Sequence, residues 1–109
     1  MNEQELLKKQ KEIQDKLSVL LVKIRLANGI KNPFNVSTEL GQSTATLRNI
    51  EKGLAFPTRK TLRELISLYA MTPIEEKEVL RLKEEMLQVR RELKELRRMR
   101  WTHVILQED

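Results

Sequence analysis

Apolar residues recur along the N-terminal part of the chain at the spacing of an α-helix. Steps of three and four residues separate these positions, and polar Gln10 fills the one gap. The positions are Leu6, Ile13, Leu17, Leu20 and Ile24. This period predicts one long amphipathic helix over residues 1–28. We interpret residues 1–15 as a helical extension, either a frayed polar segment or, as the apolar positions favour, an arm that packs on another surface.

Two short helices around a tight turn are predicted next. Asn32 is a good N-cap, and Pro33 follows at the first helical position, where its missing N–H costs nothing. Gly41 ends this helix, and two residues later Ser43 can cap a second helix over residues 44–52. Together the two helices have the form of a helix-turn-helix.

The second of these helices has two different sides. Leu47 and Ile50 fall on one side of a helical wheel. The opposite side carries small, amide and basic side chains: Ala45, Arg48, Asn49 and Lys52. Thr44 lies at the edge of this side, near the start of the helix. Such a face suits a DNA major groove, where Asn pairs with adenine, Arg with guanine, and Ala or Thr contacts the thymine methyl. The alternative is an ordinary solvated surface, but two capped helices at this spacing favour the DNA-reading interpretation.

A fourth helix follows a short loop. Thr58 can cap it, and its apolar face carries Leu62, Leu65, Ile66 and Tyr69. Arg59, Lys60 and Arg63 lie on its outside, close in sequence to the preceding helix. Contact with DNA phosphate and ordinary solvation are equally good interpretations of these three cations.

The last long segment begins at Thr72-Pro73-Ile74-Glu75, where Thr72 and Glu75 can form a capping box. No Gly or Pro interrupts it before about Arg100, a span of roughly 42 Å at 1.5 Å per residue. Its apolar seam comprises Val79, Leu82, Met86, Val89, Leu93 and Leu96. We predict that this seam pairs with a second copy as a coiled coil and makes a homodimer. The alternative is that it folds back on the N-terminal helix of its own chain, and a bundle of both helices from each copy would satisfy both.

A set of residues between about Leu17 and Met71 carries a resemblance to a known family. They are Leu40-Gly41, Ser43, the run Leu47-Arg48-Asn49-Ile50-Glu51-Lys52-Gly53, Pro57, and the helix with Leu62, Leu65 and Ile66. In this pattern the chain resembles the Cro/XRE-type helix-turn-helix domain of phage repressors and bacterial regulators. It departs from the family at Pro33, where the family usually has a Gln that contacts a phosphate.

The resemblance implies roles for particular residues. Thr44, Ala45, Arg48 and Asn49 would face DNA bases. Lys52, at the end of the same helix, would lie near a phosphate. Beside it we count Ser43, Arg59 and Lys60 as candidate phosphate contacts, because they lie close in sequence to this helix. An ion pair is implied between Arg25 and Glu51. A bacterial or phage origin is implied as well.

Composition agrees with DNA binding without establishing it. The 109 residues include 34% charged and 4% aromatic side chains, which predicts exposed helices over a modest aliphatic core. The formal net charge of +5 favours a polyanionic partner. The chain has no cysteine, which excludes disulfides and thiolate metal sites. No apolar run approaches the roughly 18 residues of a membrane span, so we expect a cytoplasmic protein. The sequence shows no set of residues typical of a catalytic site. We therefore expect that the protein is not an enzyme and needs no cofactor.

The C-terminal end changes character twice. Residues 90–100 carry six basic side chains against two acidic ones, and solvated charge beside a coiled-coil seam is favoured over a second phosphate contact or a docking strip for an acidic partner. The tail, residues 101–109, could continue the helix or form a strand. We expect Trp101 to pack at a dimer or interdomain contact, and we expect no metal at His103, which has no second His or Cys to share one.

These patterns predict an all-α fold: a compact helix-turn-helix domain of about five helices, flanked by long N- and C-terminal helices, the latter coiled-coil-like. The expected division is an N-terminal extension (1–15), a helix-turn-helix domain (16–71), a dimerisation helix (72–100) and an apolar and acidic tail (101–109). The first functional hypothesis is a sequence-specific regulator, a repressor acting as a homodimer on a roughly palindromic operator. The alternative is a protein-interaction adaptor or antitoxin-like partner that uses its long helices, with a protein partner at the C-terminal helix or tail.

Overall fold

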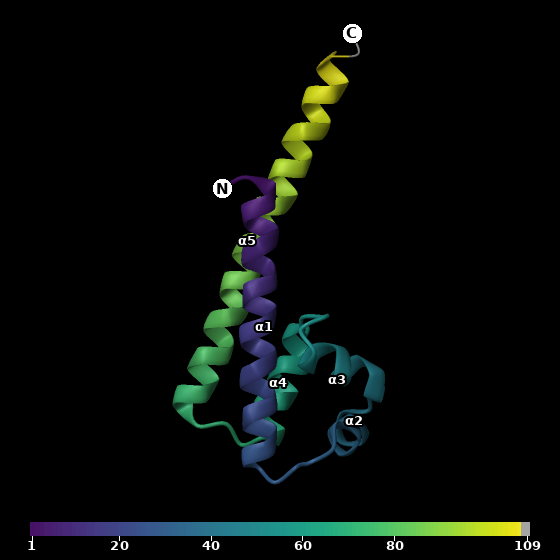
Figure 1. The fold of residues 1–109 in the computed structure, drawn as a ribbon, viewed down its shortest axis with the longest axis vertical. Helices are drawn as coiled ribbons and strands as arrows, with labels where there is room; N and C mark the ends of the chain where they lie inside the picture. Colours follow the sequence, from purple (N-terminus) through teal and green to yellow (C-terminus); the bar gives the residue numbers. More distant parts are fainter. Residues whose placement is uncertain (108–109) are drawn as a thin grey trace.

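The computed structural model of the chain describes the backbone of residues 1–107 and the side chains as far as Trp101. This part of the chain is all-helical, as predicted, with three short helices between two long ones (Figure 1). The elements are α1 (Glu3–Ala27), α2 (Pro33–Leu40), α3 (Thr44–Glu51), α4 (Arg59–Leu68) and α5 (Pro73–Gln107). Among these residues, no helix is both long enough and apolar enough to cross a membrane.

The helices begin where their capping residues predict. The Ser43 side chain accepts the backbone N–H of Thr46 at 3.1 Å and so satisfies one free donor at the start of α3. At the start of α5, the Thr72 N–H donates to Glu75 Oε1 (2.9 Å) and the Glu75 N–H donates to Thr72 Oγ1 (3.1 Å). This reciprocal pair is the predicted capping box.

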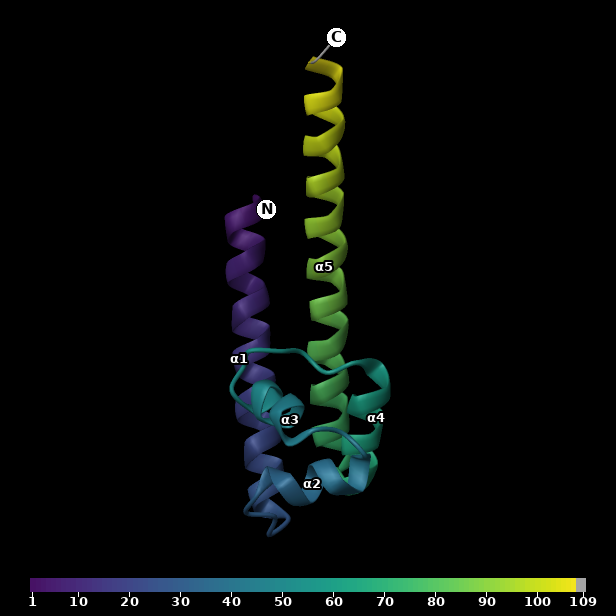
Figure 2. The ribbon, with the colours of Figure 1, turned by 90° about the vertical axis from the view of Figure 1, so that its right-hand side faces the viewer.

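The two long helices lie side by side and antiparallel, as both ribbon views show (Figures 1 and 2). They give the molecule its elongated shape, 61 × 28 × 19 Å. Leu6 and Ile13 of α1 are buried, so the N-terminal arm packs on α5 as the apolar positions favoured. At the far end, Glu3 forms ion pairs with Arg97 (3.5 Å) and Arg100 (2.8 Å). We call residues 3–15 of α1 with residues 86–101 of α5 the stalk.

The apolar seam of α5 is used within the chain, which corrects the prediction that it pairs with a second copy. Five of its six residues are less than 5% exposed: Val79, Leu82, Met86, Val89 and Leu93. The sixth, Leu96, is partly buried and packs against the same core. The cause is the length of α1, which reaches far enough along α5 to cover the seam. The structure therefore adopts the fold-back alternative. Homodimerisation itself, including a bundle of both long helices from each copy, stays a prediction.

Of the two alternatives for the tail, the structure adopts the helix as far as Gln107. Trp101 is 66% exposed, next to Arg100, which pairs with Glu3 at the start of α1. The expected contact of Trp101 with a second copy or another domain stays a prediction. The His103 side chain and residues 108–109 lie outside the described part of the structure.

Candidate nucleic-acid interface

α3 presents one free face to solvent. Leu47 and Ile50 anchor the opposite face in the core at 3% and 4% exposure. Four residues predicted to contact DNA share the exposed face: Ala45, Arg48, Asn49 and Lys52. Thr44 is half-buried, and its hydroxyl lies 3.1 Å from the hydroxyl of Ser37 on α2, so this side chain is turned towards α2. The helical pattern therefore predicted the exposed face correctly, with Thr44 at its edge.

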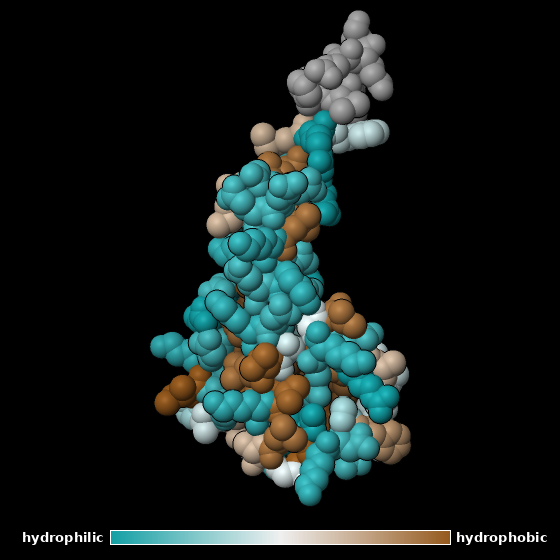
Figure 3. Space-filling view, viewed as in Figure 1, coloured by the Kyte–Doolittle hydropathy of each residue, from teal (hydrophilic) through white to brown (hydrophobic). Residues whose placement is uncertain are grey.

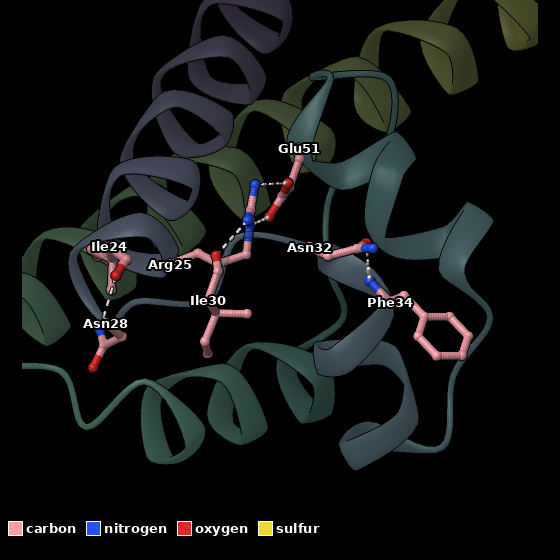
Figure 4. Close-up of polar contacts among 7 residues, drawn as sticks. All are labelled: Ile24, Arg25, Asn28, Ile30, Asn32, Phe34 and Glu51. Atoms are coloured by element: carbon pink, nitrogen blue, oxygen red, sulfur yellow. Dashed lines mark hydrogen bonds and ion pairs between the residues drawn. The ribbon is translucent and has the colours of Figure 1, made fainter.

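A buried ion pair fixes the C-terminal half of α3 to α1. The Arg25 guanidinium donates from Nε to Glu51 Oε2 (2.7 Å) and from Nη2 to Glu51 Oε1 (3.1 Å). The two side chains are only 7% and 13% exposed. The third guanidinium nitrogen, Nη1, donates to the Ile30 carbonyl at 2.7 Å (Figure 4). The implied pair is thus present, and the same Arg25 also holds the loop that leads to α2.

The ends of that loop are held by two asparagine side chains (Figure 4). Asn28 Nδ2 donates to the Ile24 carbonyl at 2.8 Å and closes the end of α1. Asn32 Oδ1 accepts the Phe34 N–H at 2.9 Å and opens α2, the predicted cap. The Phe34 ring is 56% exposed, a feature that the sequence pattern did not single out.

The C-terminal end of α3 rests against the middle of α1. Gly53 is buried at φ 73°, a left-handed conformation that glycine adopts most readily. A Cβ atom there would lie 2.7 Å from Asp15 Oδ1. The Lys11 ammonium donates to the Gly53 carbonyl at 3.1 Å and pairs with Asp15 at 3.0 Å. Lys11 is thus a positioning residue that the sequence did not reveal, because its partner stands 42 positions away.

The loop after α3 is held on α5 by two cations. The Phe56 ring lies under Lys83 Nζ (5.3 Å) and the Arg90 guanidinium (5.7 Å). Lys83 is 7% exposed and donates to the Pro57 carbonyl at 3.0 Å. Burial, together with the nearby charges of Arg90 and Arg59, lowers the pKa of Lys83. The loop that positions the start of α4 is therefore fixed to the base of the stalk.

The residues predicted to contact phosphate lie around this interface. Lys52, Arg59 and Lys60 are exposed, and none of the three has an ion-pair partner among the described side chains. The Ser43 hydroxyl is exposed but already accepts the N-cap hydrogen bond of α3. No group of His, Cys, Asp or Glu suited to a metal ion occurs in the described part of the chain. The exposed face of α3 and the start of α4 therefore carry cationic and amide side chains.

Comparisons with known proteins give no relative. The chain matches no protein-family model, no curated protein and no solved structure.

Proposed function

We propose that the protein is a sequence-specific DNA-binding transcriptional regulator that inserts α3 into a major groove. The observation that carries the proposal is the free face of α3, where Ala45, Arg48 and Asn49 are exposed while the opposite face is anchored in the core. A helix held rigidly from behind, with amide, guanidinium and methyl groups in front, can present them to base edges. The resemblance of residues 17–71 to Cro/XRE-type regulators supports the same assignment.

Each residue then has a distinct role. Asn49 pairs with an adenine edge and Arg48 with a guanine edge, while Ala45 and Thr44 contact thymine methyl groups. Phosphate contacts come from Lys52 at the end of α3, from Arg59 and Lys60 at the start of α4, and from Ser43 at the start of α3. The net charge of +5 supports such contacts, because each neutralised phosphate releases counterions.

The mode of action proposed is repression in the cytoplasm by a homodimer on a roughly palindromic operator. A two-fold symmetric pair of α3 helices requires two half-sites related by the same symmetry. Since the seam of α5 is filled by α1, the second copy docks on a different surface of the chain.

Substitutions on α3 test the proposal by separating preference from affinity. Arg48→Ala and Asn49→Ala are expected to lose about 1–3 kcal/mol each on the preferred duplex and much less on a scrambled duplex, because each removes a base contact. Lys52→Ala should weaken both duplexes about equally, because it removes a phosphate contact. Fluorescence anisotropy at one fixed salt concentration measures all three.

Lys77→Ala is a suitable control, because it removes one exposed charge from α5, far in sequence from α3. It should leave the discrimination between the two duplexes unchanged. Equal losses on preferred and scrambled duplexes for both Arg48→Ala and Asn49→Ala would count against the proposal.

A second candidate function, binding of a protein partner at the end of α5, is favoured by exposed apolar side chains there. Met99 is 59% and Trp101 is 66% exposed, next to Arg100, which pairs with Glu3 at the start of α1. If this is the main function, a chain ending at Arg100 keeps its DNA affinity and loses a co-purifying protein. Loss of DNA binding on the same truncation argues against it.

A further inference from the structure

A groove along the stalk is lined by three cations. It has a volume of about 370 Å³ and lies between Gln10 of α1 and four residues of α5, the first of which is Arg90, the residue in contact with Phe56. The α5 residues are Arg90, Leu93, Lys94 and Arg97. We call Arg90, Lys94 and Arg97 the basic strip. Figure 3 shows that the stalk surface in the view of Figure 1 is mostly hydrophilic.

The contact between Arg90 and Phe56 sets the direction in which the strip faces. Phe56 belongs to the loop that leaves α3, and the Arg90 guanidinium lies 5.7 Å from its ring centre. Residues four and seven positions further along a helix share nearly the same face. Lys94 and Arg97 therefore lie on the side of the stalk from which α3 and α4 project, and they continue the cationic surface roughly 10 Å beyond Arg90.

Acidic side chains neutralise little of this strip. Arg97 pairs with Glu3 at 3.5 Å, and both are partly exposed, a weak interaction in water. Among the described side chains, Lys94 has no hydrogen bond or ion pair, and Arg90 has no acidic partner. Beneath the loop, burial lowers the pKa of Lys83, and the nearby positive charges of Arg90 and Arg59 lower it further. Bringing a polyanion to this region relieves the mutual repulsion of these cations.

We propose that the basic strip is a second contact to the phosphate backbone of the same duplex that α3 reads. This inference rests on the proposed function of α3. Continuity favours DNA over an acidic protein as the occupant: the exposed cations Arg59 and Lys60 at the start of α4 and the basic strip border the same Phe56 loop. One duplex lying across α3 therefore meets the strip at its flank, outside the base pairs that α3 contacts.

The variant Lys94→Gln/Arg97→Gln removes two charges from exposed positions and leaves the Arg90–Phe56 contact in place. Each phosphate contact contributes roughly 0.9 to the slope of log affinity against log salt, so the variant slope should be shallower by about 1.8. Between about 50 and 200 mM salt, the wild-type affinity should therefore fall about 12-fold further than that of the variant. Lys94→Glu, a single exposed reversal, should weaken binding at every salt concentration.

The matched control is Lys16→Gln/Lys23→Gln, which removes the same charge from exposed positions that line another groove on α1. Its salt slope should equal that of the wild type. Two duplexes complete the design, one with long flanks and one cut to the base pairs that α3 reads. The strip variant should lose affinity for the long duplex only, with its base preference unchanged.

The outcomes separate this inference from the proposed function. If the wild type prefers its selected duplex but the strip variant and Lys94→Glu keep the wild-type affinity and slope, the inference is overturned and the role of α3 stands. If the strip variant and the control lose the same slope, the effect is one of net charge, and the inference is again overturned. If the wild type shows no preference among duplexes, both fall together.

Discussion

Replacing Arg25 with methionine removes the group that holds α3 and the preceding loop together. The substitution leaves the Glu51 carboxylate, whose side chain is 13% exposed, without its two hydrogen bonds. Breaking one partner of a buried ion pair costs about 3 kcal/mol or more, because an uncompensated charge stays buried. The Ile30 carbonyl loses its 2.7 Å hydrogen bond as well, which adds about 1 kcal/mol. We expect a total loss of about 4 kcal/mol, a large part of the roughly 5–15 kcal/mol that stabilises a domain of this size.

Urea unfolding followed by far-UV circular dichroism measures this loss. A double variant, Arg25→Met/Glu51→Leu, removes both charges and should recover about 2 kcal/mol relative to Arg25→Met, because no charge is left buried without a partner. Arg25→Lys keeps the charge but loses the two-pronged geometry and should fall between wild type and Arg25→Met.

The control for this series is Arg81→Met, which breaks ion pairs with Glu78 and Glu85 on the exposed side of α5. Exposed pairs contribute little to stability, so this variant should unfold close to the wild-type midpoint. If Arg25→Met is no more destabilising than Arg81→Met, the Arg25–Glu51 pair does not hold α3, and the reasoning is refuted.

Three further predictions concern backbone and pH. Gly53→Ala should lower the free energy of unfolding slightly more than Gly41→Ala in thermal denaturation. Both glycines have positive φ, but only a Cβ at Gly53 would displace the Asp15 carboxylate and disturb its ion pair with Lys11. Burial raises the pKa of Tyr69 to about 12, against 10 for an unperturbed tyrosine. The unfolded chain therefore loses this proton at a lower pH than the folded protein does, so the free energy of unfolding should fall by roughly 2 kcal/mol as the pH rises from 10 to 12. Tyr69→Phe should not show this loss. Ala70→Gly should raise the stability by about 1 kcal/mol, because Ala70 ends α4 at φ 45°.

Each of these predictions has a contradicting result. Equal losses for the two glycine variants would mean that α1 does not crowd Gly53. Identical alkaline unfolding of the wild type and Tyr69→Phe would mean that the phenol ionises as freely in the folded state as in the unfolded chain. A lower stability of Ala70→Gly would mean that the left-handed residue carries no strain.

Local signals explain why the helices could be predicted. Capping side chains act within three residues of the helix start, so Ser43, Thr58 and Thr72 are visible as N-caps in the sequence alone. The two sides of α3 follow from a period that needs no distant contact, which is why Leu47 and Ile50 could be placed in the core.

The partner of the α5 seam could not be predicted in the same way. A heptad-like period predicts that one face of a helix is buried, but it does not identify the helix that packs against that face. α1 has the matching apolar positions along its length, and packing it against α5 buries the apolar faces of both helices within one chain. The sequence carries the same pattern whether the partner is a second copy or the other end of the chain.

Contacts between distant positions account for the rest of the site. The Arg25–Glu51 pair joins residues 26 positions apart and was implied only by the family resemblance. Lys11 on Gly53 and the cations on Phe56 have no local signature, since any exposed helix carries such lysines and arginines. The same holds for the direction of the basic strip, which depends on where the Phe56 loop meets α5.

The most direct test of the account is selection of bound duplexes from a random pool at one fixed, near-physiological salt concentration. Salt must be fixed because the phosphate contribution alone changes affinity by orders of magnitude. The wild type should enrich a sequence motif, and Asn49→Ala and Arg48→Ala should each lose the base preference at particular positions of that motif. A wild-type pool that stays as random after several rounds as it was at the start would contradict it.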